Sequence, residues 1–219
     1  MSDVFIYDAV RTPRGKARPD GGLADLTPHQ LVKLQVDALR ERAGEGASHP
    51  EALLLGCVGQ VGDQGGHIAL KSKLHAQLPD TCAAHSINNY CASGLTAIGH
   101  GIAMVASGQA AAVMAGGVEC MSRVPFMGDK ASFYADAAFP PRSRYIPVVL
   151  AADRLANAEG LSRAELDSVA LVSQTRAVAA EAVPQLQRSR IAAGRLIAEE
   201  CPRAQTDDAL LAAMPAAFG

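Results

Sequence analysis

Residues 86 to 121 read S-I-N-N-Y-C-A-S-G-L-T-A-I-G-H-G-I-A-M-V-A-S-G-Q-A-A-A-V-M-A-G-G-V-E-C-M, and this stretch decides the fold. At Cys91 an extended segment with polar ends gives way to small residues. An apolar run follows, in which His100 is the sole ionisable side chain. The pattern predicts a strand, a tight turn, a buried helix and a second buried strand.

This reading places Cys91 in the first turn of the predicted helix. A thiol there faces backbone N–H groups that lack helical partners, together with the positive end of the helix dipole, and both favour the thiolate. The small residues Ala92, Ser93 and Gly94 keep the turn open to a substrate carbonyl and leave backbone N–H groups facing a developing oxyanion. Cys91 is therefore the predicted nucleophile, with a buried structural cysteine as the alternative.

Composition describes a soluble protein with a substantial core. The 219 residues are 49% apolar and 19% charged, enough for one large domain or for a domain with an insertion. Twenty Lys and Arg balance twenty-two Asp and Glu, and aromatic residues are few, so we expect no nucleic-acid partner. The uncharged segment Leu95–Val118 approaches the length of a membrane span, but its glycines favour a buried helix and strand over a bilayer segment.

The five cysteines are spread widely and show no Cys-x-x-Cys spacing. This argues against a metal cluster or a disulfide framework, and it favours a reducing, cytoplasmic compartment. The start of the chain has neither the basic residues of a signal peptide nor the pattern of a transit peptide.

The rest of the chain predicts alternating strands and helices. In order, they are a strand at Val4–Val10, a helix at 28–43 capped by Thr27, a strand at 51–58, a helix at 63–78 and a strand at 82–87. This α/β order predicts a parallel sheet covered on both faces, with Cys91 just past a strand end where ligands gather. Beyond Glu119 we expect an irregular segment at 123–147, helices at 149–158 and 163–182, a short strand at 195–198 and a helical turn at 207–213.

The predicted nucleophile lacks an evident acid or base. His100 lies about 13 Å along the helix from Cys91, and His85 up to about 20 Å back along a strand, so neither can pair with the thiol. His67, near a Gly-Gly turn, is the least implausible partner.

Four segments carry a family resemblance: R-T-P-R-G-K at 11–16, N-N-Y-C-A-S-G-L at 88–95, A-G-G-V-E-C-M-S at 115–122, and the helix L-A-A-D-R-L-A before G-L-S-R-A-E-L-D. Together they resemble the amino-terminal half of a thiolase, an acyl-CoA C-acyltransferase. The resemblance implies a layered α/β fold with an amino-terminal domain at 1–118, lacking its last strand, and a loop domain at 119–219 that covers coenzyme A.

By the same resemblance, Cys91 would carry the acyl group as a thioester, and coenzyme A would be a substrate rather than a permanently bound cofactor. Arg203 aligns loosely with a basic position near the coenzyme. Val148 and Val149 stand where relatives place residues near the acyl pocket, so the acyl-chain specificity is open. No metal site is implied.

This sequence departs from the family in one large respect. Thiolases are about twice as long, and their second half supplies Gly-His-Pro, Asn-Glu-Ala-Phe and a second catalytic Cys, none of which occurs here. We therefore expect an oligomer-forming subunit of a split thiolase, or a truncated product, that needs a carboxyl-half chain for activity. The alternatives are a related condensing enzyme, such as a ketoacyl or hydroxymethylglutaryl synthase, and a non-catalytic scaffold that binds acyl-CoA.

Overall fold

The computed structural model describes residues 3–216, which form two compact units. Of the described residues, one unit comprises 3–129 and 189–200, and the other comprises 130–188 and 201–216. The chain crosses between the units near Asp129, and residues 189–200 return to the first unit. The division into domains 1–118 and 119–219 stays a prediction. That the second part covers coenzyme A stays a prediction.

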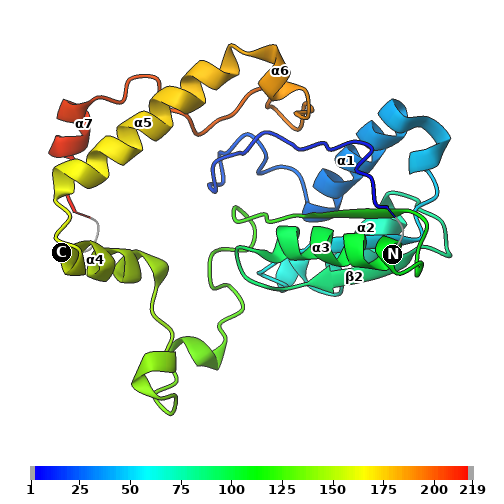
Figure 1. The fold of residues 1–219 in the computed structure, drawn as a ribbon, viewed down its shortest axis with the longest axis horizontal. Coiled ribbons are helices and arrows are strands. Elements are labelled where there is room, and N and C mark those ends of the chain that lie inside the picture. The colour runs from blue at the N-terminus through cyan, green and yellow to red at the C-terminus, as the bar shows by residue number, and fades with distance from the viewer. Residues whose placement is uncertain (1–2, 217–219) are drawn as a thin grey trace. The chain divides into compact units, whose positions relative to one another are not determined.

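The first unit is built on a parallel sheet of three strands, β1 (Ala52–Gly56), β2 (Ala83–Ile87) and β3 (Val113–Gly117), in the order β2-β1-β3 (Figure 1). The register pairs Gly56 with Ile87 on one side and with Gly117 on the other. All three strands therefore end at one edge of the sheet, and the predicted nucleophile follows β2 at this edge.

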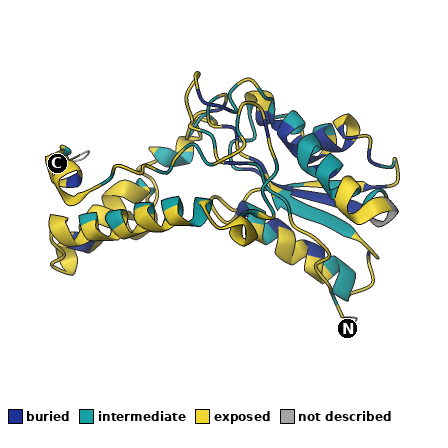
Figure 2. Ribbon diagram, turned by 90° about the horizontal axis from the view of Figure 1, so that it is seen from above, coloured by how far each residue is buried: buried dark blue, intermediate teal, exposed yellow. Residues whose placement is uncertain are grey.

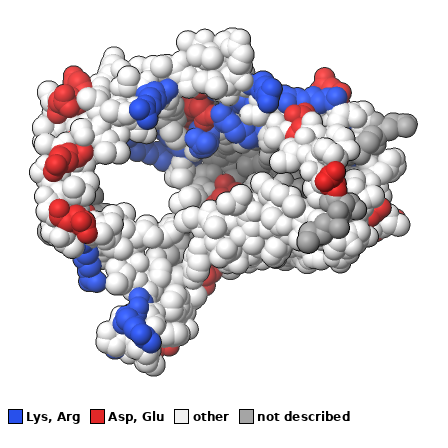
Figure 3. All heavy atoms as spheres, viewed as in Figure 1, with Lys and Arg blue, Asp and Glu red and all other residues white. Residues whose placement is uncertain are grey.

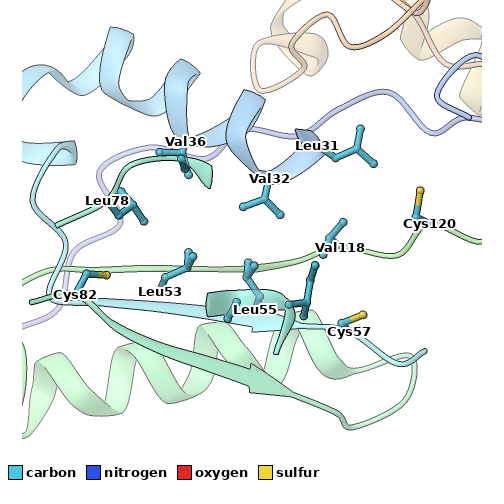
Figure 4. Packing of buried hydrophobic residues seen from close by; sticks show 13 residues of the cluster. Leu31, Val32, Val36, Leu53, Leu55, Cys57, Leu78, Cys82, Val118 and Cys120 are labelled. Atoms are coloured by element: carbon cyan, nitrogen blue, oxygen red, sulfur yellow. The ribbon is translucent and has the colours of Figure 1, made fainter. Parts of the chain in front are cut away.

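Helices cover both faces of this sheet, as the alternation of elements predicts. Helices α1 (Pro28–Ala43) and α2 (Ile68–His75) pack on one face, and α3 (Ser93–Ala106) packs on the other. Because successive side chains of a strand point to opposite faces, Leu53 and Leu55 enter the α1 side and Leu54 the α3 side. Figure 4 shows the α1 side of this core, and Figure 2 shows how burial concentrates at the sheet.

Short sequence motifs determine where two of the helices begin or end. Thr27 caps α1 in a capping box with Gln30, so the helix spans the predicted residues 28–43. Helix α3 ends at Ala106, and Gly108 follows in the left-handed region at φ 74°, so the apolar segment is interrupted where the sequence predicts. Within residues 3–216, no helix is long and apolar enough to cross a membrane.

The predicted strand at Val4–Val10 is wrong. These residues form no strand, and Phe5, Ile6 and Tyr7 are 67%, 77% and 91% exposed. A β-branched and aromatic run becomes a strand only when a sheet edge pairs with its backbone. Among the described residues, β3 pairs with β1 alone, so no strand pairs with its other edge and residues 4–10 pair with no strand of the sheet.

Two further predictions need correction. The helix at 63–78 is shorter, because Gly66 and His67 adopt left-handed backbone angles that separate the 3-10 turn Gly62–Gln64 from α2. The strand at 195–198 reduces to a single bridge between Ala193 and Leu196. It lies in a segment that hydrogen-bonds to a loop rather than to the sheet.

The second unit is helical. It contains α4 (Val148–Ala158), α5 (Arg163–Glu181), α6 (Pro184–Gln187) and α7 (Asp208–Ala213), preceded by two 3-10 turns at Ser132–Tyr134 and Pro141–Ser143. Ser162 and Glu165 form the predicted capping box of α5. The Arg163 guanidinium donates to the Leu211 carbonyl at 2.8 Å and so ties α5 to α7. This unit has few buried side chains of its own, as Figure 2 shows.

Candidate active site

Cys91 lies in the turn between β2 and α3, with its side chain exposed. The helix begins at Ser93 with Ala92 as its N-cap, so Cys91 directly precedes the cap. The prediction that places it inside the first helical turn is therefore off by two residues. The shift arises because Tyr90 takes a left-handed backbone conformation at φ 48°, which delays the start of the helix.

Close packing of glycines sets the position of this turn against the sheet. A Cβ atom on Gly56, at the end of β1, would lie 2.3 Å from the Ser93 carbonyl carbon and 2.4 Å from the Gly94 nitrogen. A Cβ atom on Gly117, at the end of β3, would lie 3.0 Å from the Gly56 carbonyl oxygen and 3.3 Å from the Gly94 Cα. The start of α3 therefore rests directly on the backbone of two strand ends, which only glycine permits.

Cys91 is exposed, whereas three of the other cysteines are buried. Cys57, Cys82 and Cys120 are buried, and burial is the largest cause that raises the pKa of each thiol. For Cys57, burial together with the nearby Glu119 carboxylate raises the pKa to about 12. These thiols stay protonated at neutral pH and are poor nucleophiles. Cys201 is exposed, in the second unit.

The histidines do not complete the site. His67, the least implausible partner in the sequence, caps α2: its Nδ1 accepts from the Leu70 backbone N–H at 3.1 Å and lies 3.1 Å from the Ser86 hydroxyl. His100 lies within α3 and His85 within β2. Within residues 3–216, no histidine or carboxylate forms a hydrogen bond with the Cys91 thiol, so the described residues place no acid or base against the predicted nucleophile.

Sequence reasoning missed a polar network beside the strand ends. Glu119 accepts hydrogen bonds from the backbone N–H of Val58 at 2.8 Å and of Gly59 at 3.3 Å. The fully buried Gln64 donates to the same carboxylate at 2.6 Å and accepts from the Cys120 backbone N–H. Glu119 thereby joins the ends of β1 and β3. The A-G-G-V-E motif gave a signal for Glu119, but nothing near Gln64 in the sequence marks its role.

The basic loop R-T-P-R-G-K is held by acidic side chains. Arg11 donates to Glu199, whose other oxygen accepts from the Arg14 backbone N–H at 2.8 Å. Glu200 accepts from the Lys16 backbone N–H at 2.7 Å. This loop lines a cavity of about 330 Å³ together with the end of β3, including Glu119. The loop is thus part of the fold of the first unit.

The predicted coenzyme residues belong to the second unit, whereas Cys91 belongs to the first. Val148 and Val149 lie in the first turn of α4 with exposed side chains. The Arg203 backbone N–H donates to Gln174 Oε1 at 2.7 Å, and its guanidinium forms no ion pair with the described residues. Within residues 3–216, no group of three or more His, Cys, Asp or Glu side chains is placed to hold a metal ion.

The parallel sheet is covered by helices on both faces, and a cysteine lies in the turn between β2 and α3. The chain is therefore an α/β protein with a cysteine at a strand-to-helix turn. Residues 4–192 match the family model described as "Thiolase, N-terminal domain". The chain therefore belongs to the thiolase family.

Named relatives agree with this family. The chain is 37% identical to a beta-ketoadipyl-CoA thiolase of Pseudomonas knackmussii over 201 residues, which are 82% of this chain and 49% of the relative. It is 32% identical to a 3-ketoacyl-CoA thiolase of Bacillus subtilis, over 82% of this chain and 46% of that protein. The chain spans about half the length of the curated relatives it matches.

The fold is also that of a thiolase. The structure of human mitochondrial 3-ketoacyl-CoA thiolase in complex with CoA matches with a TM-score of 0.81 and 25% sequence identity. The match covers 96% of this chain and 57% of the human protein. The layered α/β fold that the sequence predicts, one half of a thiolase, is confirmed.

Proposed function

We propose that this chain supplies the nucleophile half of a thiolase-type acyltransferase, in which Cys91 carries the acyl group between a 3-oxoacyl-CoA and coenzyme A. The observation that carries the proposal is the exposed Cys91 thiol in the turn after β2, in a chain of the thiolase family. Cys57, Cys82 and Cys120 are buried with raised thiol pKa values, which leaves Cys91 as the accessible thiol beside the strand ends.

In this proposal the Cys91 thiolate attacks the 3-oxo carbonyl of the substrate. The carbon–carbon bond breaks, the acyl group stays on sulfur as a thioester, and the departing acetyl-CoA carbanion takes a proton from an acid. Coenzyme A, deprotonated by a base, then attacks the thioester and releases the shortened acyl-CoA together with the free thiol. This chain provides the nucleophile and the turn that carries it, while the acid and the base come from a carboxyl-half thiolase chain.

The second part of the chain, from residue 119 onward, is proposed to cover the coenzyme. The Arg203 guanidinium, which forms no ion pair with the described residues, suits the phosphates of coenzyme A, because arginine pairs with phosphate through two parallel hydrogen bonds. Val148 is 67% exposed and Val149 lies beside it, so both can contact an apolar acyl or pantetheine chain. The human relative whose fold matches is described in complex with CoA.

The need for a second half is supported by α3. The face of this helix that points away from the sheet carries Leu95, Ile98 and Ile102, which are three and four residues apart and exposed. Figure 3 shows almost no charged side chain over this helix. An apolar stripe of this kind on a soluble protein marks a surface that another chain covers. The partner we propose is the carboxyl half of a thiolase, within a homo-oligomer of the pair.

A cytoplasmic setting belongs to the same proposal. Cys57, Cys82 and Cys120 are buried as reduced thiols, and a reducing compartment keeps them so.

The test is an assay of the purified chain with acetoacetyl-CoA and CoA, alone and with the carboxyl half of the Pseudomonas knackmussii relative. We expect no turnover from the chain alone and CoA-dependent cleavage from the pair, lost in Cys91→Ser. Cleavage that survives Cys91→Ser would overturn the proposal. If the pair binds acyl-CoA but never acylates Cys91, the chain is a non-catalytic scaffold instead.

A further inference from the structure

Tyr90, directly before the proposed nucleophile, has an uncommon backbone conformation. Its φ of 48° lies in the left-handed region, which few residues other than glycine, asparagine and aspartate adopt. For a bulky aromatic residue this conformation costs free energy, on the order of 1–3 kcal/mol, and persists only where its surroundings determine it. The hydrogen bonds around Tyr90 show what determines it here.

Asn88 holds the amino side of Tyr90. Its Oδ1 accepts from the Tyr90 backbone N–H at 3.0 Å, which forms an Asx turn. Its Nδ2 donates to the Val58 carbonyl at 3.3 Å, just beyond the end of β1. Since the Val58 N–H donates to Glu119, the Asn88 amide links the turn to the polar network that joins β1 and β3.

Ser93 holds the carboxyl side of Tyr90. Its hydroxyl donates to the Tyr90 carbonyl at 2.6 Å and accepts from the Asn89 backbone N–H at 2.8 Å. The Ser93 side chain is part of the first turn of α3, and the residue is only 4% exposed. A buried hydroxyl with both a donor and an acceptor satisfied fixes its partners in one arrangement.

We propose that Asn88 and Ser93 are positioning residues for Cys91, which clamp the left-handed Tyr90 peptide from its two sides and thereby aim the thiol and the backbone N–H groups around it. Neither side chain touches substrate in this account. Both act on the direction of the Cys91 Cα–Cβ bond, which follows from the backbone angles of Tyr90. The inference rests on the proposed function, because it assigns a purpose to the turn only if Cys91 is the nucleophile.

A change in the turn should affect two reactions of the Cys91 thiol to different extents. Alkylation by iodoacetamide displaces iodide from carbon and generates no oxyanion. Acylation by p-nitrophenyl acetate passes through a tetrahedral oxyanion, which backbone N–H groups stabilise only if they are held at a fixed place relative to the sulfur. A loosened turn should therefore slow acylation of Cys91 far more than its alkylation, because small misplacements of reacting groups are costly.

The experiment measures both rates at Cys91 and Cys201 in the same sample of the 219-residue chain, by mass spectrometry of their peptides. The exposed Cys201 lies in the other unit and serves as the internal reference. The variants are Ser93→Ala, Asn88→Ala and the conservative Asn88→Asp, which keeps the acceptor for the Tyr90 N–H. Ser107→Ala is the matched control, because Ser107 donates to the Met104 carbonyl at 3.1 Å near the opposite end of α3. Urea unfolding confirms that each variant is folded.

We expect Ser93→Ala and Asn88→Ala to lower the acylation rate of Cys91 about tenfold, with its alkylation changed less than about twofold. Asn88→Asp retains most of the acylation rate, and Ser107→Ala retains all of it. Acylation of folded Ser93→Ala and Asn88→Ala at the wild-type rate, or an equal fall in both reactions, would overturn the inference and leave the proposed nucleophile standing. If wild-type Cys91 is acylated no faster than Cys201, the nucleophile itself is wrong and the inference falls with it.

Discussion

Gly56 at the end of β1 and Ser93 at the start of α3 are in direct backbone contact: a Cβ atom on Gly56 would lie 2.3 Å from the Ser93 carbonyl carbon. Neither backbone can yield easily, since one belongs to the central strand and the other to the first turn of a helix. This contact sets the distance between the turn that carries Cys91 and the end of β1. It makes Gly56 a structural requirement of the proposed active site.

We expect Gly56→Ala to lower the free energy of unfolding by about 1–3 kcal/mol, because the added methyl group must push the start of α3 off the sheet. Gly116→Ala in β3 is the matched control, since a Cβ atom there meets nothing within 4 Å. Its unfolding free energy should stay within about 0.5 kcal/mol of wild type or rise slightly. Urea unfolding curves measure both. Equal midpoints for the two variants would show that the contact is not a tight one.

The buried Cys57 thiol should make the protein sensitive to alkaline pH. Burial, with Glu119 nearby, raises its pKa from about 9 to about 12, so the folded state keeps a proton that the unfolded state releases. Stability is therefore full below pH 9 and falls as pH rises toward 12, by up to about 1.4 kcal/mol per pH unit. Urea midpoints at pH 8, 9 and 10 measure the slope, and Cys57→Ala should flatten it. A wild-type slope no steeper than that of Cys57→Ala would contradict the assignment.

Glu199 and Glu200 should each protect one backbone amide of the basic loop. Glu199 accepts from the Arg14 N–H and Glu200 from the Lys16 N–H. Burial, the largest influence on Glu199, raises its pKa, but the hydrogen bonds from Arg14 and Arg11 outweigh it and the net pKa is lowered. The carboxylate thus stabilises the fold above its ordinary pKa near 4.5 and loses this effect as pH falls below that value.

Hydrogen exchange at pH 7 separates the two carboxylates. Glu199→Gln should speed exchange at the Arg14 amide about tenfold and Glu200→Gln at the Lys16 amide, each with a smaller effect on the other amide. Glu41→Gln, an exposed carboxylate on α1, should change neither. If both amides exchange at the wild-type rate in the two variants, the acidic pair does not hold the loop.

The fold was predictable where local chemistry decides it. The Thr27 and Ser162 capping boxes placed the starts of two helices, because such signals lie within four residues of the boundary they set. The strand prediction at Val4–Val10 failed for the opposite reason, since a strand depends on a pairing edge that the segment itself does not encode. Local propensity alone cannot supply that edge.

The sequence singles out Cys91 as the predicted nucleophile, but it does not reveal the residues that hold the turn around it. Cys91 stands out because it lies between an extended segment with polar ends and a run of small residues. Tyr90 gave no sign of its left-handed angle, because that angle is imposed by Asn88 and Ser93 through hydrogen bonds whose geometry appears only in the folded chain. Gln64 reaches Glu119 across 55 residues of sequence, a distance at which no local pattern operates.

The central claim is that Cys91 receives the acyl group. Its most direct test mixes the chain with acetoacetyl-CoA and the carboxyl half of the Pseudomonas knackmussii relative, stops the reaction in acid, and locates acetyl groups on peptides by mass spectrometry. We predict an acetyl thioester on the peptide that carries Cys91, absent from Cys91→Ser and discharged by added CoA. Acetylation at another residue, with Cys91 left unmodified while substrate is consumed, would contradict the account.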